Sequence, residues 1–171
     1  MKNWIQLLQI RKKNSSTKNP LSPTFLLLQV FTVEEMMPHL QGVNGAVTKN
    51  LFLKDKKKKG LWLVSARHDR QVNLNDLAKK LGVESGNLCF ADEAAMLEKL
   101  KVGQGCATAL ALLFNQGHSV KLVLDRDLVE GGHKMVYFHP MTNAAIMGLR
   151  PDDLLCFLKE TGHEPIFKCF E

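Results

Sequence analysis

Short apolar runs, separated by polar or glycine-containing segments, recur along the chain from residue 51 onward, and they constrain the fold most strongly. Runs of this kind are typical of β-strands when turn residues bound them. We expect strands at 51–53, 61–66, 87–90, 109–114, 120–125, 135–139 and 143–149, with 164–170 closing the sheet. The polar loop 54–60 joins the first two strands as a hairpin.

Helices are expected between some of these strands. The predicted segments are 75–81, 92–100 ending near Gly103, and a last helix from Pro151 to Gly162, with a short one after Thr32. Asn73 is a candidate N-cap for 75–81, and Gly82 is a natural terminator. Many strands with scattered helices predict an α+β fold, with a mixed, barrel-like β-sheet surrounded by helices.

The first thirty residues differ in composition from the rest. Five basic residues and no acidic residue lie before residue 32, so the remaining chain carries only +1 of the net charge of +6. Overall charge is therefore weak evidence for RNA binding. We expect residues 1–30 to form a disordered basic tail and 31–171 to form one folded domain. An alternative for the tail is a mitochondrial targeting segment.

Cysteine spacing and hydropathy narrow the class of protein. The four cysteines, Cys89, Cys106, Cys156 and Cys169, form no C-x-x-C pair, which argues against a zinc cluster or a disulfide scaffold. A reducing compartment, and hence the cytoplasm, is expected. No apolar run approaches the roughly 20 residues that span a bilayer, so we expect no membrane partner.

Conventional catalytic motifs are missing, but three polar segments stand out. There is no G-x-S-x-G elbow, H-E-x-x-H pair, P-loop or Rossmann glycine pattern. The three segments are Thr48–Leu53 at a strand start, the small-residue loop Gly103–Ala109, and Phe138–Asn143 between two strands. Taken singly, each has a structural explanation: a solvated lysine, a turn glycine and a packing histidine.

These segments and Thr161–Pro165 follow the order and spacing of motifs in the YbaK/prolyl-tRNA synthetase associated domain family. The chain resembles this family over about residues 31–166. The resemblance implies a trans-editing hydrolase that deacylates mischarged tRNA, with alanyl-tRNA(Pro) as the expected substrate. It implies no metal and no cofactor. The implied partners are the acceptor end of tRNA(Pro) and, as a second candidate, prolyl-tRNA synthetase.

The same resemblance assigns roles to residues. It implies a catalytic group in which Lys49 holds the terminal phosphate or ester region, Asn50 hydrogen-bonds the substrate and His139 shapes the pocket. A free ribose hydroxyl beside the ester would assist the attacking water. Expected substrate-binding residues are Gly105, Cys106, Ala107, Thr108, Ala109, Thr142 and Asn143. Expected tRNA contacts are Lys54, Lys56, Lys57 and Lys58 at the hairpin tip.

Some positions depart from the family pattern and keep other interpretations open. Ala109 replaces the usual proline, Ile146 replaces a common hydroxyl residue, and Arg150 stands where a helix-capping side chain is preferred. These changes favour a second hypothesis, a catalytically impaired tRNA- or synthetase-binding module. A third is an RNA-binding protein driven by the tail and hairpin lysines. His163, just past a helix end that favours an imidazolium, is interpreted as structural.

Overall fold

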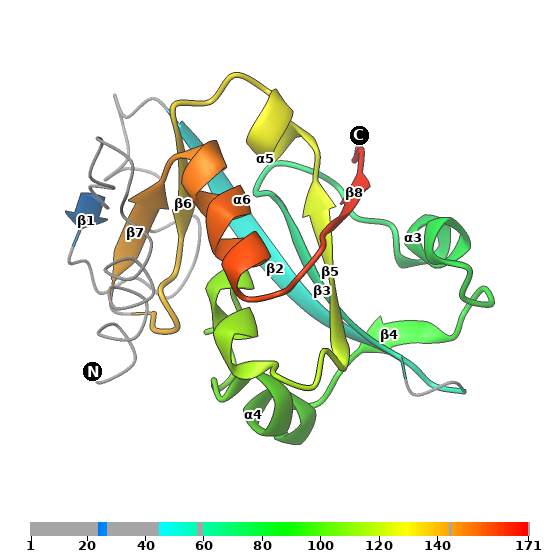
Figure 1. Cartoon of the computed structure of the whole chain (residues 1–171). Helices are drawn as coiled ribbons and strands as arrows, with labels where there is room; N and C mark the ends of the chain where they lie inside the picture. Colours follow the sequence, from blue (N-terminus) through cyan, green and yellow to red (C-terminus); the bar gives the residue numbers. More distant parts are fainter. Residues whose placement is uncertain (1–23, 27–44, 58–59, 144, 171) are drawn as a thin grey trace.

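The computed structural model describes residues 24–26, 45–57, 60–143 and 145–170 (Figure 1). Within these ranges an eight-stranded sheet has the order β1-β7-β6-β2-β3-β5-β8, and β4 pairs with β2 off this path. The strands are β1 Thr24–Leu26, β2 Gly45–Asp55, β3 Leu61–Arg67, β4 Leu88–Phe90, β5 Val120–Asp125, β6 Met135–Phe138, β7 Ile146–Leu149 and β8 Ile166–Lys168. The helices are α3 Leu74–Leu81, α4 Glu93–Leu100, α5 Asp127–Glu130 and α6 Pro151–Glu160, with a 3-10 helix, η2, at Ala109–Phe114.

The long strand β2 joins the two halves of the sheet. It runs antiparallel to β3 along one edge. On its other edge, residues 45–47 pair with β6 in parallel, and residues 53–55 pair with β4 in antiparallel register. Among the residues that the structure describes, positions 48–52 have no strand partner on this second edge. We call this opening the β2 gap.

Two apolar clusters lie on opposite faces of β2, because successive side chains of a strand point to opposite faces. Phe52 belongs to a cluster that includes Leu110 of η2 and Leu154 of α6. Leu53, the next residue, belongs to a cluster that includes Leu77 of α3. Accordingly, α3 lies well apart from α4 and α6 (Figure 1). The mixed sheet with helices around it confirms the predicted α+β fold class.

The predicted helix ends at α3 are confirmed. The side chain of Asn73 accepts hydrogen bonds from the amides of Asn75 and Asp76, which satisfies donors at the helix start. Gly82 adopts a left-handed conformation with φ of 69°, which a residue without Cβ adopts at little cost. At α6, Pro151 is in the first turn, while Arg150 makes no side-chain cap and pairs with Asp153 instead.

The sequence-based prediction was wrong at residues 109–114, which form η2 rather than a strand. This run is apolar and almost wholly buried, so its periodicity does not separate a strand from a helix. The Thr108 side chain accepts from the Leu110 amide and starts the 3-10 turn. Other differences are smaller: β2 begins at Gly45 rather than residue 51, β7 begins at Ile146, and α5 was not predicted.

The amino-terminal segment is described only at β1. Thr24–Leu26, which the prediction assigned to a disordered tail, pairs with β7 in antiparallel register, so these residues belong to the sheet. The rest of the predicted tail and the helix predicted after Thr32 lie outside the described residues.

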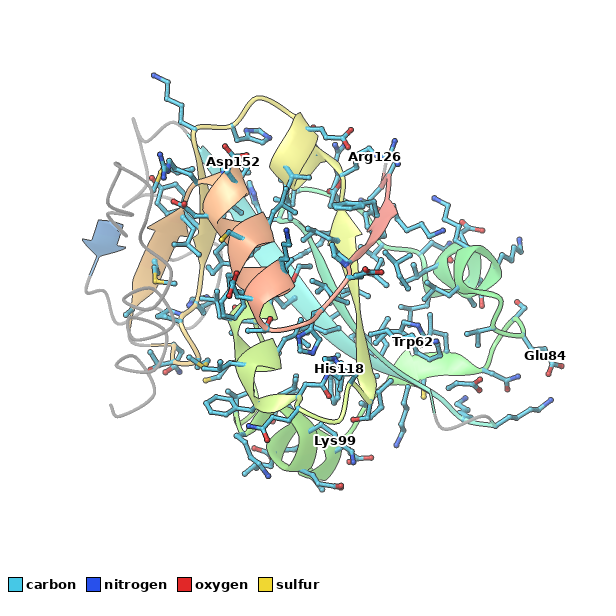
Figure 2. The ribbon with its side chains drawn as sticks, viewed as in Figure 1. Trp62, Glu84, Lys99, His118, Arg126 and Asp152 are labelled. Atoms are coloured by element: carbon cyan, nitrogen blue, oxygen red, sulfur yellow. The ribbon has the colours of Figure 1, made fainter. Side chains whose placement is uncertain are left out.

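Asn115, just after η2, and His163 form a buried polar pair. The amide of Asn115 accepts from the Val120 N–H at Oδ1 and donates to the Val120 carbonyl through Nδ2. These two bonds identify Nδ2 of Asn115 as a donor. The same Nδ2 lies 3.0 Å from Nε2 of His163, so Nε2 must accept a hydrogen bond from it. Burial, with a smaller effect from the neighbouring His118, lowers the pKa of His163. Figure 2 shows His118 beyond the C-terminal end of α6. His163 is structural, as predicted, but its site favours the neutral imidazole rather than the imidazolium.

Candidate functional site

A cavity of about 530 Å³ opens at the β2 gap. Residues 48–52 of β2 line it, together with His139 just after β6 and Phe90 at the end of β4. The loop before η2 contributes Gly105 and Ala107. Five predicted site residues therefore meet at one cavity: Lys49, Asn50, Gly105, Ala107 and His139.

The backbone of β2 also contributes polar groups to this cavity. The Phe52 carbonyl accepts from the Ala91 amide on the gap side, whereas the Val47 carbonyl accepts from His68 on the β3 side. Main-chain groups of alternate residues point to the same edge of a strand. The N–H and C=O of Asn50 therefore point into the β2 gap, where no strand of the described ranges pairs with them.

The Asn50 side chain is oriented by its neighbour on β3. Ser65 faces Asn50 in the antiparallel register, and its hydroxyl donates to Asn50 Oδ1. Because Oδ1 is engaged, the Nδ2 group is the end of the amide that can donate to a ligand. Asn50 lies on the same face of β2 as Phe52, the face covered by α4 and η2.

Lys49 leaves β2 on the opposite face, and its ammonium donates to the main-chain carbonyl of Arg70. An ammonium has three donors, and within the described ranges one of them is used, so two remain for a ligand. The Arg70 guanidinium lies 3.4 Å from Asp125 and 3.6 Å from Asp127. The residue that binds Lys49 is thus itself held by ion pairs.

These ion pairs belong to a partly buried network, centred on buried Asp125, that the sequence-based prediction missed. The Asp125 side chain is 1% exposed and accepts from the backbone amides of Arg67 and Asp127. Asp127 also accepts from His133 at 3.0 Å and from the Arg67 guanidinium at 2.8 Å. The hydrogen bond from His133, with the charge of Arg67, lowers the pKa of Asp127. A signal was available: charged residues follow both β3 and β5, and parallel strands bring such ends together.

His139 is a half-buried residue in the cavity wall. Burial lowers the pKa of His139, and a hydrogen bond with the Ala145 backbone only partly opposes this effect. Its Nδ1 is buried, and no hydrogen-bond partner for it is found in the described part of the chain. At neutral pH this imidazole can accept or donate a hydrogen bond, but it does not supply a positive charge.

The loop Gly103–Ala109 has residues that line the cavity and residues that pack against the core. Gly105 has φ of 79°, and no atom lies within 4 Å of a Cβ added there, so backbone conformation rather than space requires glycine. Cys106 packs against the core, Thr108 caps η2, and Ala109 is fully buried. Thr142 and Asn143 are likewise absent from the cavity lining.

The hairpin lysines occupy different positions. Lys54 pairs with Asp92 at 2.6 Å, which places it beside a residue of the cavity lining, and this hydrogen bond raises the pKa of Lys54. Lys57 pairs with Glu84 at 2.7 Å, and Lys56 lies 3.5 Å from the Gly86 carbonyl, both away from the cavity. Lys58 lies outside the described residues.

The described residues lack two features that would point to other functions. No group of three or more His, Cys, Asp and Glu side chains suited to hold a metal ion was found among them. Of the helices in the described ranges, none is both long and apolar enough to cross a bilayer.

Comparison with known proteins identifies relatives of this chain. The model of the aminoacyl-tRNA editing domain family matches residues 29–157. The chain is 71% identical over 143 residues to the prolyl-tRNA synthetase associated domain-containing protein 1 of Bos taurus, covering 84% of this chain and 83% of that protein. It is 34% identical over 143 residues to the prolyl-tRNA editing protein ProX of Acetoanaerobium sticklandii, covering 83% of each.

Solved structures share the fold. One described as a candidate trans-editing enzyme for prolyl tRNA synthetase superposes with a TM-score of 0.69 and covers 99% of this chain and 96% of its own. Its sequence identity is 18%, so the likeness concerns the fold alone.

Proposed function

This chain belongs to the aminoacyl-tRNA editing domain family, and from that premise we propose that it hydrolyses the ester of mischarged tRNA, with alanyl-tRNA(Pro) as its substrate. The observation that carries the proposal is the meeting of Lys49, Asn50 and His139 at the β2 gap. At the gap the main-chain N–H of Asn50 has no strand partner in the described ranges, and a free N–H of this kind can bind an ester oxygen.

The proposed reaction relies on positioning and on hydrogen bonds to developing charge. Water adds to the ester carbonyl carbon, the bond from this carbon to the ribose oxygen breaks, and the released ribose oxygen receives the proton. The Asn50 amide donates to the carbonyl oxygen as negative charge develops there. The adjacent ribose hydroxyl of the tRNA orients the water, so the protein needs no nucleophile of its own.

Lys49 supplies the positive charge in this scheme. Its two remaining donors bind the terminal phosphate while the third stays on the Arg70 carbonyl. Neutral His139 completes the wall of the cavity and keeps bulk water away from the ester.

Selection of alanine over proline is proposed to be steric. The face of the cavity beside Asn50 is lined by Phe52, Met96 and Ala107, which rest on the packed core. Proline is larger than alanine by two methylenes. Attraction discriminates by only about 1–3 kcal/mol per methylene, whereas a wall that cannot yield excludes the larger residue more strongly.

The three departures from the family pattern, Ala109, Ile146 and Arg150, are not among the residues that line this cavity. Ala109 is buried at the start of η2, and Ile146 is buried at the start of β7. Neither lines the cavity, which supports the hydrolase over the impaired binding module. The test is hydrolysis of alanyl-tRNA(Pro) beside prolyl-tRNA(Pro): the hydrolase requires selective loss of the alanyl ester, whereas a binding module leaves both esters intact.

A further inference from the structure

Phe90 is an aromatic residue that remains exposed at the mouth of the cavity. It is the last residue of β4, and it is 62% exposed. Leu97 of α4, at 51%, is the other exposed large hydrophobic residue of the described ranges, and it does not line the cavity. A single exposed apolar side chain is ordinary on a protein surface. What distinguishes Phe90 is its position in the lining of the cavity.

The register of β4 on β2 defines the face on which Phe90 lies. Phe90 stands directly opposite Leu53, and directly opposed residues of antiparallel strands share a face. Lys49 shares the face of Leu53, because alternate residues of β2 point the same way. Phe90 and Lys49 thus lie on one face of the sheet at the β2 gap, while Asn50 lies on the other.

Lys49 and Phe90 offer one nucleotide two kinds of contact. Four residues of extended strand separate Lys49 from Leu53, the residue that Phe90 faces, which is about 13 Å between the Cα atoms of Lys49 and Leu53. Both Lys49 and Phe90 line the cavity. A lysine cation binds a phosphate and an exposed aromatic ring stacks on a base, and a nucleotide joins these two groups through one ribose.

We propose that Phe90 is the platform on which the terminal adenine of the tRNA acceptor end stacks. This inference rests on the proposed function, because the terminal adenosine carries the ester. The nucleotide then lies on the face of Lys49 and Phe90, and the ester passes through the β2 gap. The alanyl group reaches the face of Asn50, which Phe52, Met96 and Ala107 line.

The test measures the contribution of the base to binding. Two non-hydrolysable ligands are compared by calorimetry: 3′-alanylamido-3′-deoxyadenosine 5′-phosphate and the same ribose phosphate without the base. They are titrated into the full chain and its variants Phe90→Ala and Phe90→Tyr. Leu97→Ala is the matched control for loss of an exposed apolar side chain. Because Phe90 is exposed, its truncation leaves the core intact, and thermal unfolding of each variant verifies this.

We expect the adenine base to increase affinity only in chains that have an aromatic ring at position 90. Stacking predicts that Phe90→Ala lowers the affinity for the adenosine ligand by about tenfold or more and leaves the affinity for the abasic ligand unchanged. Phe90→Tyr and Leu97→Ala should bind both ligands as the parent chain does. Equal binding of both ligands by the parent chain, or equal weakening of both by Phe90→Ala, would overturn the inference.

Hydrolysis of alanyl-tRNA(Pro) by the same preparations separates this inference from the proposed function. Stacking predicts a higher KM for Phe90→Ala with a smaller change in kcat. Hydrolysis by the parent chain with no dependence on Phe90 rejects the platform and leaves the hydrolase standing. Absence of hydrolysis by the folded parent chain rejects the hydrolase and, with it, the platform.

Discussion

Lys49 and Asn50 are consecutive residues of β2 whose side chains leave the strand on opposite faces, yet both line one cavity. The β2 gap makes this arrangement possible, because a ligand at an open strand edge can reach both faces. Each residue has its own support. Ser65 orients Asn50 on one face, and the Arg70 carbonyl binds Lys49 on the other.

The first prediction concerns Ser65, which should act through Asn50. Ser65→Ala frees Asn50 Oδ1, and we expect kcat for alanyl-tRNA(Pro) to fall by about tenfold, the equivalent of one hydrogen bond. In a double-mutant cycle with Asn50→Ala, the Ser65 substitution should have no further effect on kcat. Independent, additive losses would show that Ser65 does not act by orienting the amide.

The second prediction concerns the network behind Lys49. Asp125→Asn removes a buried carboxylate that binds Arg70 and two backbone amides, and we expect a loss of about 2 kcal/mol in the free energy of unfolding. Urea titration measures this loss. The matched control is Asp76→Asn, which breaks an exposed pair with Lys79 and should change stability by less than about 0.5 kcal/mol. Equal effects of the two substitutions would contradict a structural role for the network.

The third prediction concerns pH. Because burial lowers the pKa of His163, the unfolded chain binds a proton more readily than the folded chain between the two pKa values. The contribution of neutral His163 to stability is therefore complete above about pH 6.5, the ordinary value, and is lost as the pH falls through the folded pKa. His139 shifts in the same direction. Denaturant titrations from pH 8 to 5 should show falling stability for the parent chain and a shallower fall for His163→Gln.

Three carboxylates affect stability in a separate, more acidic pH range: Asp69, Asp92 and Asp127. Their ion-pair partners lower their pKa values, so their contributions are lost only as the pH falls below about 4. Parallel pH profiles of the parent chain and His163→Gln between pH 7 and 5 would rule out the assigned state of His163.

The fourth prediction concerns Ala109, where the family pattern has proline. Ala109 is the first residue of η2, a position where proline fits, and Thr108 before it is extended at φ of −157° and ψ of 151°, as a residue before proline must be. Ala109→Pro should raise the free energy of unfolding by about 0.4–1 kcal/mol through the unfolded state. Thermal unfolding measures this gain in stability. A lower melting temperature for Ala109→Pro would show that the buried site cannot accept the proline ring.

Much of the fold followed from local signals. The Asn73 and Gly82 ends of α3 and the segment 120–125 were predictable, because caps and bounded apolar runs are local features. Residues 109–114 were not, because an almost wholly buried apolar run has no polar face to reveal its period. Pairing of β1 with β7 joins residues far apart in sequence, and no local pattern encodes it.

The candidate site was predictable in part. Motif resemblance brought Lys49, Asn50 and His139 forward, and the structure places them at one cavity. The resemblance did not separate Ala107, which lines the cavity, from Thr108, which caps η2, because adjacent loop residues point in different directions. Phe90 was missed, since exposure of an aromatic residue at a strand end depends on the surrounding tertiary structure.

We propose that Lys49 at the β2 gap supports hydrolysis of a mischarged tRNA. The direct measurement is single-turnover deacylation of alanyl-tRNA(Pro) and prolyl-tRNA(Pro) by the full chain, by Lys49→Ala and by the control Lys79→Ala, whose ammonium pairs with Asp76 on α3 away from the cavity. We predict selective hydrolysis of the alanyl ester, a loss of about 100-fold or more in Lys49→Ala, which is about 2.7 kcal/mol of barrier, and near-parent rates in Lys79→Ala. Equal rates for Lys49→Ala and the parent chain would rule out this role of Lys49, and no hydrolysis by either would rule out the hydrolase.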